Sequence, residues 1–80
     1  KRHTLLAGLL LFGASLMAQT KDTETADKMF NRLEYIDAAQ AYEKLVEAGK
    51  GDGYIYKQLG DSYYNIFNTA QASKWYAKAV

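Results

Sequence analysis

The sequence predicts an all-α fold in which antiparallel helix hairpins stack on one another. Two observations predict it: an apolar stripe with helical spacing in the second half of the chain, and a period of about 34 residues that relates the two halves. The stripe occupies positions i, i+3, i+4 and i+7 of one helix, so its side chains face the same way. Its members are Tyr56, Leu59, Gly60 and Tyr63.

Gly60 predicts a close helix contact. Glycine in a helix interior costs about 1 kcal/mol relative to alanine, so its presence indicates that another backbone passes nearby. The next helix carries small Ala72 and large Tyr76. Small residues facing large ones allow two antiparallel helices to interdigitate about 8 to 10 Å apart.

The period is read from pairs of like residues. Ala38 pairs with Ala72 and Tyr42 with Tyr76, and the separation of these pairs along the chain is called here the repeat offset. Further pairs at the repeat offset are Asp27 with Asp61, Asn31 with Asn65, Lys44 with Lys78, and Val46 with Val80. The upstream copy is degenerate, which is expected of an end repeat that has no preceding neighbour.

These positions resemble the tetratricopeptide repeat (TPR). Tyr56 stands in the Trp place of its first helix, Leu59, Gly60 and Tyr63 follow in register, and Ala72 with Tyr76 fits the A-x3-F pattern. The resemblance implies a TPR superhelix, with a first repeat over 19–52 and a second over 53–80, truncated at its C-terminus. We expect each repeat to be one helix hairpin.

Capping signals predict where the helices begin. We expect the first helix to be capped by Asp22 or Thr23 and to run to Leu33 or Glu34, and an Asp37–Gln40 capping box to open the second. Gly49 ends that second helix. Asp52 and Thr69 are the expected caps of a third helix over 53–67 and of the fourth helix. The turn over 49–53 has three glycines but lacks the G-K-[ST] ending of a phosphate-binding loop.

The N-terminus has the composition of a secretory signal peptide. Lys1 and Arg2 precede an apolar run from Leu5 to Met17, and the small Ala18 follows. The run is shorter than the roughly 20 apolar residues that span a membrane. We therefore predict a cleavable signal peptide over 1–18, no membrane span, and export of the mature chain.

The remaining residues predict neither catalysis nor nucleic-acid binding. Beyond residue 18 the chain has eight Lys and Arg against nine Asp and Glu, so no basic footprint for nucleic acid remains. His3 is the one histidine and there is no cysteine, so a nucleophile pair cannot form. Glu43 and Glu47 are interpreted as a solvated helix face. We expect no enzyme activity, no cofactor and no metal.

The TPR resemblance implies that a protein or peptide partner binds the concave face, which the first helix of each repeat lines. In the TPR register Tyr54 belongs to that face, and the candidate binding residues, called here the docking face, are Asp27, Phe30, Asn31, Lys57, Asp61, Tyr64 and Asn65. Amides suit the main chain of a peptide, and aromatic rings supply rigid contact area. Asp27 and Asp61 stand where chaperone-binding TPRs place Asn, so an anionic peptide end is disfavoured. The alternatives are that these residues only face solvent, or that Phe30 and Tyr64 pack against a following repeat.

A signal peptide followed by a TPR that begins ETADKMFNRLEYIDAAQAYEKL also resembles the front of Bacteroidota OmpA-family periplasmic proteins. The resemblance implies a periplasmic, outer-membrane-associated interaction scaffold linked to type IX secretion and gliding, with an outer-membrane barrel of the PorP/SprF kind as partner. Peptidoglycan binding in that family belongs to a domain that these residues do not contain. The alternative is an accessory TPR module of an exported enzyme whose catalytic domain lies beyond Val80.

Overall fold

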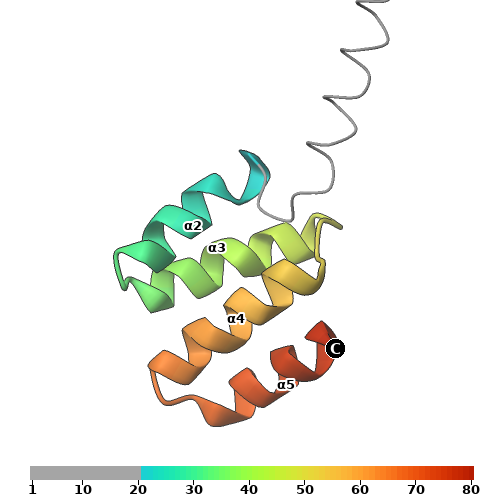
Figure 1. Cartoon of the computed structure of the whole chain (residues 1–80). Coiled ribbons are helices and arrows are strands. Elements are labelled where there is room, and N and C mark those ends of the chain that lie inside the picture. Colours follow the sequence, from blue (N-terminus) through green and yellow to red (C-terminus); the bar gives the residue numbers. More distant parts are fainter. Residues whose placement is uncertain (1–20) are drawn as a thin grey trace, which may run out of the picture.

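The computed structural model describes residues 21–80, which are all helical apart from their turns. A short 3-10 turn, Lys21–Thr23, leads into α2 (Glu24–Asn31), α3 (Tyr35–Glu47), α4 (Gly53–Asn65) and α5 (Thr69–Ala79). Each helix packs against the next one in the chain, as Figure 1 shows. The all-α prediction is confirmed for this part of the chain. The predicted signal peptide, 1–18, lies outside the described residues.

The four helices form two hairpins, α2 with α3 and α4 with α5, called here the first and second hairpin (Figure 1). The core runs through both hairpins and across the α3–α4 contact between them. Its buried hydrophobic members are Ala26, Ala38, Ala39, Tyr42, Ile55, Leu59 and Trp75. Tyr42 and Leu59 are completely buried, so the hairpins are held together by apolar burial around these two residues.

Gly60 lies against α5, as its place in the stripe predicts. A Cβ on Gly60 would overlap the ring of Tyr76. The close neighbour is therefore an aromatic ring on α5 and not a backbone, which corrects the expected cause of the glycine. Tyr76 is only half-buried, whereas Tyr42, at the same place in the first hairpin, is completely buried.

Three helices end in the same left-handed reversal. At the end of α3, Gly49 has φ 81°; its amide donates to Val46 O at 3.0 Å, and the next amide donates to Leu45 O at 2.9 Å. This pair of backbone hydrogen bonds defines a Schellman motif, in which glycine is the favoured left-handed residue. Leu33 and Phe67 adopt φ 65° and 64° in matching motifs after α2 and α4, although neither is glycine.

These reversals correct several predicted boundaries. Helices α2 and α4 end at Asn31 and Asn65, earlier than the predicted positions. The reversal at Leu33 makes Glu34 the N-cap of α3, so the predicted Asp37–Gln40 capping box is wrong; the Glu34 carboxylate instead pairs with Arg32.

The side-chain caps agree only in part with the predictions. Asp52 caps α4 as predicted, by accepting a hydrogen bond from Ile55 N at 2.9 Å. The predicted Thr69 cap of α5 is wrong, because Asn68 accepts from Gln71 N at 3.2 Å. Thr23 occupies the N-cap position of α2, but its side chain makes no capping bond.

Replacing Phe67 by glycine is expected to stabilise the protein by about 0.5 to 1 kcal/mol. The left-handed conformation strains any residue with a Cβ by about 1 to 2 kcal/mol, and part of that gain is lost to the greater freedom of glycine in the unfolded chain. The Phe67 ring is 90 % exposed, so little burial is lost. Chemical denaturation measures the change. Phe67→Ala is the control, because it removes the ring and keeps the strain; equal stability of the two variants would contradict this explanation.

Candidate docking face and its buried carboxylate

A buried carboxylate joins the two hairpins. Asp27 on α2 is 4 % exposed, and its Oδ2 accepts a hydrogen bond from the Thr23 hydroxyl at 2.8 Å. Its Oδ1 accepts bonds from the Tyr42 hydroxyl on α3 and from the Tyr54 hydroxyl on α4, the latter at 2.7 Å. Three hydroxyl donors replace the water that burial removes, and this is the condition for keeping a carboxylate inside a protein.

The second hairpin contains half of the same arrangement. Asp61 corresponds to Asp27 at the repeat offset, and its Oδ1 accepts a bond from the Tyr76 hydroxyl, as Asp27 does from Tyr42. Its Oδ2 pairs with Lys57 Nζ at 2.8 Å, where Asp27 has Thr23. The Asp61 side chain is 26 % exposed. An Asp–Tyr hydrogen bond therefore links the two helices of each hairpin, in addition to their apolar packing.

Burial raises the pKa of several tyrosine hydroxyls from a usual value of 10. The pKa of Tyr54 rises to about 12 through burial and then through its bond to Asp27. Burial together with a bond to a carboxylate also raises the pKa of Tyr63, which donates to Glu43 Oε2 at 2.6 Å, and of Tyr76 to about 12. The pKa of the buried Tyr42 hydroxyl is raised further for the same two reasons.

Stability is expected to be lost in alkaline solution. The unfolded tyrosines ionise near pH 10, whereas the folded ones resist ionisation up to about pH 12. Their contribution is therefore complete below pH 10 and is lost as the pH rises from 10 through 12. Urea denaturation at a series of pH values measures this fall. Tyr63→Phe is the comparison, because it removes one ionising group; an unchanged slope in that variant would show that Tyr63 does not contribute.

Two members of the predicted docking face, Asp27 and Phe30, pack against the interior of the protein. Asp27 is buried, and its carboxylate is engaged by hydroxyls of three elements. Phe30 is half-buried against the core and meets Tyr35 edge to face, with ring centroids 5.4 Å apart. Tyr54 is half-buried and donates to Asp27. Asp27 thus does not reach solvent, which corrects its expected role as a surface carboxylate.

The other members lie at the surface. Tyr64 is 61 % exposed, and Asn31, Lys57 and Asn65 are exposed. Asn65 donates from its amide nitrogen to Asp61 O of its own helix, at 2.7 Å, and this bond holds the exposed amide against the backbone of α4. The exposed part of the docking face therefore lies mainly on α4, where it combines the phenol of Tyr64, the cation of Lys57 and the amide of Asn65.

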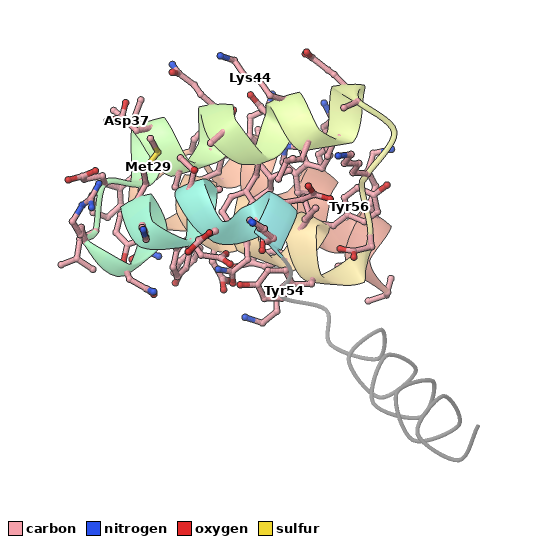
Figure 2. All side chains as sticks on the ribbon, turned by 90° about the horizontal axis from the view of Figure 1, so that it is seen from above. Met29, Asp37, Lys44, Tyr54 and Tyr56 are labelled. Carbon is pink, nitrogen blue, oxygen red and sulfur yellow. The ribbon has the colours of Figure 1, made fainter. Side chains whose placement is uncertain are left out.

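A groove of about 350 Å³ opens between α2 and α3 on the first hairpin. Figure 2 shows Met29 between these two helices, with Asp37 and Lys44 on the α3 side and Tyr54 on the opposite side of the molecule. Its lining residues are Asp22, Thr25, Ala26, Met29, Asp37, Gln40, Ala41, Lys44 and Leu45. The apolar floor with charged residues at its rim suits an apolar side chain of a peptide better than a reacting substrate.

The same place in the second hairpin is filled by aromatic rings. Tyr56 and Trp75, which correspond to Asp22 and Ala41 at the repeat offset, stack with centroids 5.9 Å apart. Trp75 is buried at the α4–α5 contact. The groove thus exists because small or polar residues stand on the first hairpin where the second hairpin has its largest rings.

The sequence pattern did not identify the hydrogen-bonded network. Gln58 and Ser62 are buried on α4 and were not predicted to be so; Gln58 Nε2 donates to the Tyr42 hydroxyl at 3.1 Å, and Ser62 Oγ donates to Gln58 O at 2.8 Å. One signal was available. Aspartate and tyrosine both recur at the repeat offset, and an acceptor and a donor that recur together indicate a bonded pair.

Within residues 21–80 no group of three or more His, Cys, Asp or Glu side chains is arranged to hold a metal ion. In the same part of the chain, no helix has both the length and the apolar character that crossing a membrane requires. No protein-family model, curated protein or solved structure matches this chain. The candidate function therefore depends on the geometry described above.

Proposed function

We propose that this chain is the TPR segment of a non-catalytic protein–protein interaction scaffold of the cell envelope. The proposal rests on the repetition of one hydrogen bond, between an aspartate and a tyrosine, at the same place in both hairpins. It also rests on the exposure of Tyr64, Lys57 and Asn65 on α4. A stack of like hairpins presents an extended surface for a partner segment, and exposed aromatic and amide groups are suited to bind one.

Export and envelope location belong to the same proposal. They are supported by the composition of residues 1–18 and by the resemblance to OmpA-family periplasmic proteins. A protein partner such as an outer-membrane barrel of the PorP/SprF kind would bind the exposed docking face. Asp61 at that face, only partly neutralised by Lys57, favours a partner segment that is neutral or basic.

Partner capture from solubilised envelope tests the proposal. We expect the protein to recover a defined partner, and the Tyr64→Ala, Asn65→Ala double variant to lose it. Neither residue contributes to the buried core, so the variant should remain folded. Lys74→Ala, Lys78→Ala on α5 is a matched control with two exposed substitutions. Equal recovery by the wild type and both variants would exclude the docking face.

A further inference from the structure

Exposed apolar side chains lie at the turns that join the two helices of each hairpin. Leu33, between α2 and α3, is 69 % exposed, and Phe67, between α4 and α5, is 90 % exposed. Ile36, in the first turn of α3, is 60 % exposed. Ile66 lines an open recess of about 380 Å³ together with Leu33 and Ile36. Figure 1 shows both turns at the same end of the helices, opposite the α3–α4 turn. These four residues are called here the apolar edge.

The stacking of neighbouring hairpins does not cover the apolar edge. Leu33 and Ile36 are mostly exposed although the second hairpin already lies beside the first. The two hairpins contact each other through the helices α3 and α4, so the turn between α2 and α3 stays at the surface. By the same geometry, a further hairpin beside the second one would leave Phe67 at the surface.

The backbone provides a second and independent observation. Leu33 and Phe67 correspond at the repeat offset, and both are left-handed, with φ 65° and 64°. Glycine suits this conformation, and Gly49 provides it at the end of α3. A bulky side chain at such a position is strained, and these two bury little surface in return. Strain that the fold does not need is concentrated at functional sites.

The two turns share apolar character but not shape. Leu33 is branched and aliphatic, whereas Phe67 at the corresponding place is flat and aromatic. A protein pocket is sensitive to the shape of the side chain that fills it, because protein interfaces are closely packed. Transfer into hydrocarbon is non-directional and depends on the apolar area alone. Corresponding positions that keep apolar character and differ in shape therefore suit a lipid surface better than a protein pocket.

The charges near the apolar edge are few and nearly balanced. Residues 62–73, which include the second turn, contain no charged side chain. In the first turn, Arg32 Nε pairs with Glu34 Oε2 at 3.1 Å, so Asp37 is the one remaining charge within residues 31–37. Anionic lipids attract basic segments, and this edge has no excess of positive charge. Apolar contact with a neutral bilayer is therefore the interaction that it supports.

We propose that the apolar edge inserts into the interfacial layer of a bilayer of neutral, zwitterionic lipids. Leu33, Ile36 and Phe67 enter the boundary between headgroups and acyl chains, and the helices stay outside it. This contact is peripheral and does not span the membrane. It goes beyond the proposed scaffold function, because it holds the chain at a lipid surface through residues that are not part of the docking face.

A fluorophore beside Phe67 tests the proposal in the full chain. The chain has no cysteine, so Thr69→Cys can carry a single environment-sensitive dye at an exposed site next to the second turn. Vesicles of phosphatidylcholine should raise the emission of the dye and shift it to the blue. The same dye at Glu47→Cys, exposed at the opposite end of α3, should not respond. A site-specific signal is needed because the apolar run from Leu5 to Met17 can also bind lipid.

The double variant Leu33→Gly, Phe67→Gly, made in the Thr69→Cys chain, separates lipid binding from folding. Glycine relieves the strain at both turns, so urea denaturation should show that the variant is no less stable than its parent. The lipid concentration that gives half of the dye response should rise roughly ten-fold or more, because two apolar side chains are lost from the contact. Phe67→Leu keeps an apolar side chain and should retain most of the response.

Several outcomes would overturn the proposal. They include an equal response at residues 69 and 47, an unchanged response in the glycine variant, and a response that appears only when phosphatidylglycerol is mixed into the vesicles. Should vesicles give no response while the emission rises with protein concentration, or on capture of the envelope partner, the apolar edge is a protein interface and the lipid assignment is wrong. The scaffold function is tested separately, by partner capture with the Tyr64→Ala, Asn65→Ala variant.

Discussion

Asp27→Ala is expected to destabilise the protein by about 3 kcal/mol. The substitution leaves the hydroxyls of Tyr42 and Tyr54 without their common acceptor, and each unsatisfied buried donor costs about 1 to 3 kcal/mol. A helical domain of this size rarely exceeds about 3 to 5 kcal/mol of stability, so the variant should be largely unfolded. Urea denaturation followed by circular dichroism measures the change.

Asp61→Ala is the matched control. It removes the same side chain from the same place in the second hairpin, where the carboxylate is 26 % exposed and pairs with an exposed lysine. Water replaces the lost bonds there, and we expect a cost of about 1 kcal/mol. Equal losses from the two variants would contradict the view that burial of Asp27 makes its bonds indispensable.

Tyr42→Ala is expected to cost about 3 to 5 kcal/mol, the range for removing a fully buried aromatic side chain. The substitution creates a cavity in the buried core and also deprives Asp27 and Gln58 of a hydrogen-bonding partner. Thermal unfolding of the variant and the wild type measures the difference.

Tyr76→Ala provides the comparison for Tyr42. Tyr76 corresponds to Tyr42 at the repeat offset, but it is only half-buried. We therefore expect a smaller loss, about 1 to 2 kcal/mol. A larger loss at Tyr76 than at Tyr42 would contradict the assignment of the core to the contact between the hairpins.

The sequence contained enough to predict the helices and their pairing. Helical spacing placed Leu59 in the core, and the repeat offset placed Ala38 and Ala72 at the contacts within each hairpin; all three are buried. Asp52 was predicted as a cap because aspartate is a favoured N-cap residue and stands directly before the third predicted helix. Helical spacing and capping depend only on neighbouring residues, and the repeat offset is visible in the sequence itself, so these predictions needed no knowledge of tertiary contacts.

Three features could not be predicted, for different physical reasons. The reversals at Leu33 and Phe67 lack the glycine that marks a left-handed residue, and the surrounding helices impose the strained conformation. The burial of Asp27 depends on Tyr54 from the other hairpin, so it is a property of the assembled structure. The α2–α3 groove exists because the first hairpin lacks the large rings that the second hairpin has in Tyr56 and Trp75. A repeat pattern is read from the residues that the two copies share, so it does not reveal such a difference.

Photo-crosslinking at Tyr64 in intact cells tests most directly whether this chain is an interaction scaffold. A benzoylphenylalanine replaces Tyr64, which is 61 % exposed on α4, and in a second strain replaces the exposed Lys74 on α5. The proposed function predicts that residue 64 crosslinks to one envelope protein, that residue 74 does not, and that adding Asn65→Ala reduces the yield. Crosslinking of the same protein from residue 74 alone, or equally from both positions, would contradict it.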